Sequence, residues 1–217
     1  MKAARQRLPD SNIPNPDEAR IAEAVAAIRA GEVVVCPTET FYALAADARS
    51  VKSLERVFEL KGRDAAKTIA LIAADAKMAF SIAREIPHLA RRLARKFWPG
   101  PLTLVLPARD GLPEALLGPD GGVGVRVSPD RYASALALAL DAPITATSAN
   151  LSGAPAAVTL DPVRQAFGGK IKVMLDGGRL PGGAPSTLVR CRAGGFDILR
   201  EGAISRDAIA AALAEQI

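Results

Sequence analysis

Residues 143–153 read PITATSANLSG, a short apolar run that ends in hydroxyl and amide side chains. The first half is typical of a buried strand, whereas Thr147, Ser148 and Asn150 are small hydrogen-bonding residues. Two explanations stay open for this change of character. The polar residues form a local turn after the strand, or they hold a ligand where the strand ends.

The composition of the 217 residues is that of an ordinary globular protein, with 49% hydrophobic and 24% charged residues. Aromatic residues make up only 4%, so we expect a core of Ala, Val, Leu and Ile. No run approaches the roughly 20 apolar residues of a membrane span, and the N-terminus lacks an apolar signal region. The sequence therefore predicts a cytoplasmic protein without a membrane segment.

The formal net charge is +5, which favours polyanions such as nucleic acid or nucleotide phosphates without establishing one. The two cysteines, Cys36 and Cys191, each lie in an apolar, strand-like run. Two isolated cysteines make neither a disulfide framework nor a zinc pattern, so we expect both to be small buried residues. No metal site made of protein side chains is predicted.

The order of predicted elements favours a single α/β domain over residues 16–217 with a mixed sheet, preceded by an irregular lead-in at 1–15. A cap at Asn15 and Pro16 is expected to begin the first helix, and Ser50 and Ser205 to cap two later ones. Helices are predicted at 16–30, 51–60, 75–84, 87–97, 129–140, 161–167 and 206–215. Strands are predicted at 32–36, 68–73, 102–107, 122–127, 143–147, 171–175, 186–191 and 196–200, and a polar loop at 37–43.

Several common catalytic motifs are missing. The one histidine, His88, begins a predicted helix and is expected at the surface, and no serine lies in G-x-S-x-G. Gly168, Gly169 and Lys170 do not complete a phosphate-binding P-loop, and no G-x-G-x-x-G follows a strand. The sequence therefore gives no support to a Ser-His-Asp triad, a P-loop enzyme or a standard dinucleotide site.

Hydroxyl groups and cations instead gather where predicted strands and helices end. Each has a structural alternative: a turn for Thr38, favourable helix-dipole contact for Lys61 and Arg63, and a structural carboxylate partner for Arg126. Taken together they suit an anionic ligand, because open α/β sheets bind ligands at strand ends. The residues alone predict a nucleotide or phosphorylated ligand in a basic cleft. The set is Thr38, Lys61, Arg63, Arg126, Ser148, Asn150, Ser152, Ser186 and Arg200.

A predicted helix at 87–97 carries several cations beside an apolar face. These cations are Arg91, Arg92, Arg95 and Lys96. They are expected either to contact RNA phosphates or to form a solvated helix face.

The order of several motifs resembles that of the YrdC-like threonylcarbamoyl-AMP synthases, in their short single-domain form. The similarity covers roughly residues 16–216, and the pairing of K-x-R with S-x-N makes it specific. The motifs are PTETFYALAADA (37–48), KGR (61–63), WPGPLTLVL (98–106), VGVRV (123–127), TSANLSG (147–153), ST (186–187) and LREGAIS (199–205).

The resemblance implies a twisted mixed sheet flanked by helices, with a concave basic surface. It implies an enzyme that joins L-threonine, bicarbonate or CO2, and ATP into L-threonylcarbamoyladenylate and releases pyrophosphate. Mg²⁺ is expected to arrive with ATP. Partner proteins would then transfer the threonylcarbamoyl group to adenosine 37 of tRNAs reading ANN codons, and tRNA itself is a candidate ligand.

The resemblance also assigns roles to residues. Contacts with threonine or its carbamate fall to Thr38, Arg126, Thr147 and Ser186. Contacts with ATP, chiefly its phosphates, fall to Lys61, Arg63, Ser148, Asn150 and Arg200. Lys61 and Arg63 would stabilise charge during the reaction, in which no protein nucleophile is expected.

This chain departs from the family pattern at Ala43, Asp64 and Thr68, where Gly, Pro and Pro are common. Asp64 places a carboxylate beside the expected phosphate cations. The Gly- and Pro-rich segment 176–185 is interpreted as a lid that excludes water. The alternative function from another class is a non-catalytic RNA-binding module on the same fold.

Overall fold

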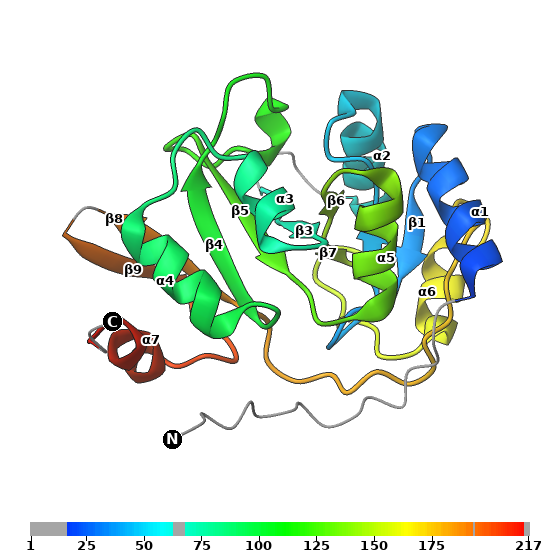
Figure 1. Ribbon diagram of the computed structural model, residues 1–217. Coiled ribbons are helices and arrows are strands. Elements are labelled where there is room, and N and C mark those ends of the chain that lie inside the picture. The colour runs from blue at the N-terminus through cyan, green and yellow to red at the C-terminus, as the bar shows by residue number, and fades with distance from the viewer. Residues whose placement is uncertain (1–16, 63–67, 193, 215–217) are drawn as a thin grey trace.

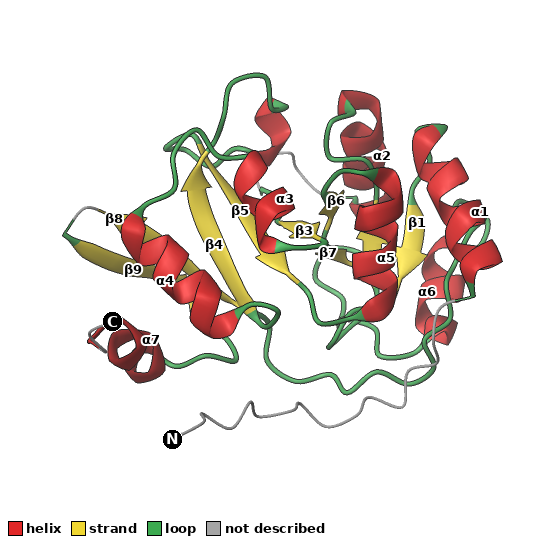
Figure 2. Ribbon diagram, viewed as in Figure 1, coloured by secondary structure: helices red, strands yellow, loops and turns green. Residues whose placement is uncertain are grey.

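The computed structural model describes residues 17–62, 68–192 and 194–214. Its helices are α1 Glu18–Arg29, α2 Val51–Lys61, α3 Ala76–Ser81, α4 His88–Phe97, α5 Arg131–Leu140, α6 Leu160–Phe167 and α7 Arg206–Ala214, with one 3₁₀ turn at Glu114–Leu116. Its strands are β1 Val34–Cys36, β2 Ala43–Ala45, β3 Leu71–Ala73, β4 Leu102–Pro107, β5 Gly122–Val127, β6 Ile144–Thr145, β7 Thr147–Ser148, β8 Thr187–Arg192 and β9 Gly195–Arg200. Figure 2 shows the strands running between helices that lie toward the outside.

The strands form two sheets, one of six strands in the order β6-β3-β5-β4-β8-β9 and one of three in the order β1-β2-β7. β3 pairs with β5 in parallel, as β4 does with β8, whereas the other strand pairs are antiparallel. The prediction of a mixed α/β sheet flanked by helices is confirmed (Figure 1).

The predicted strand 143–147 is in fact two short strands that belong to different sheets. β6 pairs with β3, and β7 pairs with β2 directly afterwards. Thr145, which is fully buried, donates its hydroxyl to the Leu44 carbonyl (3.0 Å) and accepts from the Ala46 amide (3.0 Å). One threonine therefore ties the end of the six-stranded sheet to the backbone that follows β2.

Two predictions about strands were wrong. β2 begins in the segment predicted as a polar loop, because its three buried residues carry no periodic pattern but pair with β1 and β7. Conversely, 171–175 forms only a single parallel bridge, between Met174 and Val35. The amides of Val35 and Leu175 complete that bridge with carbonyl partners at 3.0 and 2.9 Å, which is too few pairs for a strand.

Helix caps agree with the sequence in two cases and differ in two. Ser50 and Ser205 accept backbone amides at the starts of α2 and α7, as predicted. Asp17 caps α1 by accepting from Ala19, whereas the predicted cap at Asn15 and Pro16 lies outside the described residues. The helix predicted from 129 begins at Arg131, because Asp130 caps it with its side chain.

The six-stranded sheet uses its two faces differently. Leu104 of β4 and Val125 of β5 point into a core shared with α3, α4 and α7, and α3 and α4 lie over that face in Figure 1. The alternate residues of the same strands point to the other side, because side chains alternate along a strand. That other face carries the cavity described below.

Both cysteines are free and buried, as predicted. A second core cluster joins α1 and α5 to β1, and Arg29 links the two helices by donating to the Ala139 carbonyl at 3.0 Å. Within the described ranges, no helix combines the length and apolar character needed to cross a membrane.

The junction at Thr145 predicts a specific effect on stability. Thr145→Val keeps the side-chain shape but removes both hydroxyl bonds, leaving buried backbone groups without those partners. We expect the free energy of unfolding to fall by about 2 kcal/mol or more in a denaturant titration. Thr145→Ser retains the hydroxyl and is expected to cost less; a Thr145→Val variant that is as stable as the wild type would contradict the role of these hydrogen bonds.

Candidate functional site

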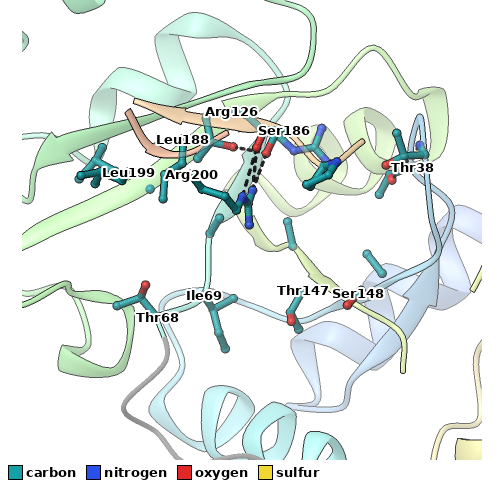
Figure 3. Close-up of a pocket in the computed structure, with 18 of the residues that line it drawn as sticks. Thr38, Thr68, Ile69, Arg126, Thr147, Ser148, Ser186, Leu188, Leu199 and Arg200 are labelled. Carbon is teal, nitrogen blue, oxygen red and sulfur yellow. Dashed lines mark hydrogen bonds between the residues drawn. The ribbon is translucent and has the colours of Figure 1, made fainter. Parts of the chain in front are cut away.

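A cavity of about 590 Å³ opens where the two sheets meet. One wall consists of one face of β4, β5, β8 and β9, and the opposite wall includes Thr38 and residues 40–43, 68–70 and 146–148. Figure 3 shows Arg126, Ser186 and Arg200 on one side of the open space and Thr147 and Ser148 on the other. A cavity of this volume is typical of a small-molecule site.

Two glycines of β5 keep the cavity open. A Cβ atom at Gly122 would lie 2.7 Å from Val105 Cγ1, and one at Gly124 would lie 3.4 Å from Thr103 Cγ2. Side chains at these positions would occupy the floor of the cavity. In GVGVRV the glycines therefore leave space for the cavity on one face of the sheet, and the valines pack into the core on the other face.

Two arginines converge on the wall formed by β5 and β9. Arg200 donates through Nη2 to the Ser186 carbonyl (2.9 Å) and hydroxyl (3.0 Å), and that hydroxyl also lies 2.8 Å from Thr103 Oγ1. Burial and the charge of Arg126 lower the pKa of Arg200. An anion bound at this wall would relieve that repulsion.

Arg126 is 8% exposed, lines the cavity and pairs with Glu39. The Ser128 hydroxyl donates to the other Glu39 carboxylate oxygen at 2.6 Å. Burial opposes ionisation of Glu39, but the Arg126 guanidinium and these hydrogen bonds outweigh it and hold the pKa of Glu39 below its usual value. Glu39 is therefore the structural carboxylate partner considered for Arg126. Arg126 pairs with Glu39 and lines the cavity as well.

Asp130 continues the hydrogen-bond network of Arg126, Glu39 and Ser128, and it does not itself line the cavity. Its amide donates to Ser128 Oγ (3.1 Å), and its Oδ1 accepts from the amides of Tyr132 and Ala133 at the start of α5. Its Oδ2 is buried and has no hydrogen-bond partner among the described residues. Burial raises the pKa of Asp130 to about 6, although the helix amides oppose the rise.

Lys61 and the TSANLSG segment lie side by side, although 87 positions separate Lys61 from Ser148. The Lys61 ammonium donates to the Ser148 carbonyl (2.6 Å) and to Asn150 Oδ1 (2.9 Å), and the amine is almost completely buried. Ser152 in turn donates its amide to the Lys61 carbonyl at 3.1 Å. Lys61 and Asn150 therefore reach the cavity wall through Ser148, which lines it.

The structure brings six of the predicted residues to one cavity and leaves one undescribed. The lining includes Thr38, Arg126, Thr147, Ser148, Ser186 and Arg200. Thr38 also makes the turn considered for it, donating its hydroxyl to the Phe41 carbonyl at 2.7 Å. Arg63 and its neighbour Asp64 lie outside the described residues, while Ala43 and Thr68 both line the cavity. The assigned roles, and the wider concave basic surface, stay predictions.

The residues of the basic helix lie elsewhere. Arg91 and Arg95 line a separate cavity, and Arg92 donates to the Ala212 carbonyl of α7 at 3.3 Å. Lys96 is exposed in the last turn of α4, and His88 is exposed at its first residue, as expected for a surface position.

The segment 176–185 is anchored over its first part, which limits the lid interpretation. The fully buried Tyr42 donates its hydroxyl to the Gly178 carbonyl (2.7 Å) and accepts the Gly177 amide (3.1 Å). Leu180 is buried and bonds through its amide to Val158. Of this segment, only Gly183 and Pro185 line the cavity.

Sequence reasoning missed three residues that shape the site: Thr103, Glu39 and Ser128. Thr103 is a fully buried hydroxyl in an otherwise apolar strand, and that contrast was a usable signal. Glu39 lay inside a quoted motif but was given no role. Its contact with Ser128 joins residues 89 positions apart, which no local pattern reveals.

The fold and the site together define an α/β protein with a small-molecule cavity lined by hydroxyl and guanidinium groups. The family model Sua5_yciO_yrdC, described as telomere recombination, matches residues 26–202. The chain belongs to this Sua5/YciO/YrdC family.

Individual relatives agree with this assignment. The chain is 39% identical over 173 residues to the threonylcarbamoyl-AMP synthase of Pyrococcus abyssi, which covers 80% of the chain and 51% of that protein. It is 35% identical over 184 residues to the threonylcarbamoyl-AMP synthase of Vibrio cholerae, covering 84% and 97%. P. abyssi Sua5 complexed with L-threonine superposes with a TM-score of 0.87 at 36% identity, covering 93% of this chain and 59% of that one. The chain thus spans about half of the Pyrococcus relative and nearly all of the Vibrio one.

The Arg126–Glu39 pair predicts coupled effects on stability. Glu39→Gln and Arg126→Met each leave the partner charge nearly buried, at 9% and 17% side-chain exposure in the intact pair. We expect each to lower the free energy of unfolding by about 2–3 kcal/mol, and the double variant to lose less than the sum by about 1 kcal/mol or more. Strictly additive losses in denaturant titrations would contradict the coupling.

Asp130 predicts a pH dependence of stability. Its pKa is raised to about 6 in the folded protein, so the folded state binds more protons than the unfolded state above the ordinary value of 3.8. Relative to Asp130→Asn, the wild type should therefore lose stability as the pH rises from about 4 to about 7, by about 2–3 kcal/mol. Asn retains an amide oxygen for the helix cap, and a constant difference across this pH range would contradict the prediction.

Proposed function

We propose that this protein is an L-threonylcarbamoyladenylate synthase, which condenses L-threonine, bicarbonate or CO2, and ATP and releases pyrophosphate. The observation that carries the proposal is the meeting of two polar walls at one cavity. Arg126, Arg200 and Ser186 form one wall, and the turn held by Lys61 presents Thr147 and Ser148 on the other. Two relatives named threonylcarbamoyl-AMP synthase and a Sua5 structure with L-threonine support the choice of substrates.

The lining suits a displacement at phosphorus more than covalent catalysis. The threonine amine adds to CO2 and loses a proton, and a carbamate oxygen then attacks the α-phosphate while the bond to pyrophosphate breaks. Such a reaction needs positioning and neutralisation of negative charge, which guanidinium and hydroxyl groups supply. No cysteine or histidine occurs among the described residues that line the cavity.

In this proposal each substrate contacts both walls of the cavity. Arg126, Thr38, Thr147 and Ser186 contact threonine or its carbamate. The phosphates of ATP lie along Ser148 and Arg200, with Lys61 and Asn150 behind Ser148. The resemblance assigns Arg63, which lies outside the described residues, to the same phosphates. The buried Arg126 and the exposed Arg200 repel each other, and they are therefore well suited to a polyanion, because binding it removes an existing electrostatic cost.

Mg²⁺ would enter with the triphosphate. The described lining offers hydroxyl oxygens but no carboxylate, so the phosphates and water would supply most of its ligands. The ion would supply further charge neutralisation on the phosphates. This chain's own residues would orient the triphosphate through Arg200 and Ser148.

The product would serve tRNA modification in the cytoplasm. In this proposal, separate threonylcarbamoyl-transferase proteins take the adenylate and modify adenosine 37 of tRNAs reading ANN codons. Proteins named threonylcarbamoyl-AMP synthase among the relatives support this place in the reaction sequence.

The test is release of pyrophosphate from ATP by the purified protein. Release should require both L-threonine and bicarbonate, and Lys61→Met should lower kcat/KM by about tenfold or more, which corresponds to about 1.4 kcal/mol. Lys52→Met is the matched control, because Lys52 is exposed on the same helix α2 and should leave kcat/KM unchanged.

Folded protein that releases no pyrophosphate in a threonine-dependent manner would refute the proposal and favour the non-catalytic RNA-binding alternative. Equal losses in the Lys61 and Lys52 variants would contradict the role of the Lys61 turn. Thermal unfolding of both variants separates a loss of activity from a loss of fold.

A further inference from the structure

A second cavity of about 340 Å³ lies on the other side of β5 from the first. Val127 lines it, whereas the preceding residue, Arg126, lines the first cavity, and adjacent strand residues point to opposite faces. The two cavities share no lining residue. The second one opens beside α3 and α4, at Val127, which ends β5, and at Ala74, which directly follows the parallel strand β3.

Two aromatic rings form part of its wall. The rings of Phe80 and Trp98 lie with their centroids 5.5 Å apart and tilted by 38°. The Trp98 indole N–H donates to the Leu102 carbonyl at 2.7 Å, so its polar atom is already satisfied. Both residues are only partly buried, which leaves ring surface available to a planar ligand.

Two arginines of α4 stand beside these rings. Arg91 and Arg95 are one helical turn apart and therefore share a face of α4, and both line the cavity. The Arg91 guanidinium lies 5.7 Å from the centroid of the Phe80 ring. Both side chains are exposed, and none of the ion pairs between described residues uses either of them.

We propose that this cavity binds an unpaired nucleotide of single-stranded nucleic acid, with its base against Phe80 and Trp98 and its phosphate between Arg91 and Arg95. Proteins commonly bind single-stranded nucleic acid with aromatic side chains beside arginines, because every base can stack on a ring and every phosphate is negatively charged. A base in a duplex is stacked and paired, and it cannot enter a cavity of this kind.

Asp75 is the one carboxylate in the described lining, and it sets where the phosphate lies. Its Oδ1 accepts the Met78 amide at 2.7 Å and caps α3. A phosphate is therefore repelled from the α3 side and directed toward α4. Asp75→Asn keeps an oxygen for the cap and removes the charge, so it should tighten binding about two- to threefold.

The sequence provides its own reporter, because Trp98 is the only tryptophan in the chain. Titration with a short single-stranded RNA of mixed sequence should change Trp98 fluorescence in a saturable way. The double variant Arg91→Ala/Arg95→Ala should bind the RNA more weakly, with a dissociation constant raised by about tenfold or more. The same RNA annealed to its complement should leave the fluorescence unchanged.

The control double variant Lys170→Ala/Lys172→Ala removes the same charge from exposed positions outside the cavity and should stay within about twofold of wild type. Equal weakening in the two double variants would show unspecific attraction and overturn the proposal. Binding of the duplex as tight as that of the single strand would also overturn the proposal. Binding of AMP as tight as that of the strand would overturn it too, because the cavity would then be a mononucleotide site.

This inference is independent of the proposed synthase activity. The Arg91→Ala/Arg95→Ala variant should release pyrophosphate at the wild-type rate and unfold at the wild-type temperature. Arg91→Lys/Arg95→Lys keeps the charge but not the planar groups, and should bind more tightly than the alanine variant and less tightly than wild type. A fluorescence response that these arginine variants leave unchanged would place the RNA elsewhere and overturn the proposal.

Discussion

Ile144–Ser148 is hydrogen-bonded to two different sheets within five residues, and the position of the cavity follows from that constraint. β6 ends the six-stranded sheet on β3, and β7 then adds to β2. The buried hydroxyl of Thr145 satisfies backbone groups on both sides of β2's end. Because the chain leaves one sheet and joins the other at this point, the two sheets diverge here. Thr147 and Ser148 then lie across the cavity from Arg126 of β5.

Charge inside the site is only partly balanced by the protein itself. Glu39 neutralises Arg126, and Ser128 fixes the orientation of that carboxylate, so the pair can stay buried. Arg200 has only neutral partners at Ser186 and feels the field of Arg126. Among the described residues of this wall, Arg200 therefore carries a positive charge that no ion pair offsets, whereas Arg126 and Arg190 each pair with a carboxylate.

Local sequence patterns predicted the elements whose stability is local or periodic. The bounds of β4 and β5 were predicted correctly, because alternation in β5 and an apolar run in β4 are visible in the sequence. The helix caps Ser50 and Ser205 were also predicted correctly from the local sequence. β2 was not, because its three residues become a strand only through pairing with β1 and β7.

The same distinction holds in the site. Residue types at strand ends predicted Thr38, Ser148, Ser186 and Arg200 as members of one site, and the charge inside the apolar strand GVGVRV added Arg126; all five line the cavity. The partners that restrain them were not predictable, because they come from distant segments. The Lys61 ammonium meets Ser148 across 87 positions, a contact that the sequence order alone does not specify.

How the cavity excludes water follows from which parts of its rim are fixed. Tyr42 holds the backbone at Gly177 and Gly178, and burial raises its pKa to about 12, so its hydroxyl keeps its proton and continues to donate. The backbone from 176 to 182 is thereby bonded to the core at several points. Within this segment the unanchored part is confined to the residues around Gly183, because the Pro185 carbonyl accepts the Ala203 amide at 2.9 Å. Such a preorganised rim lowers the ordering entropy lost on binding.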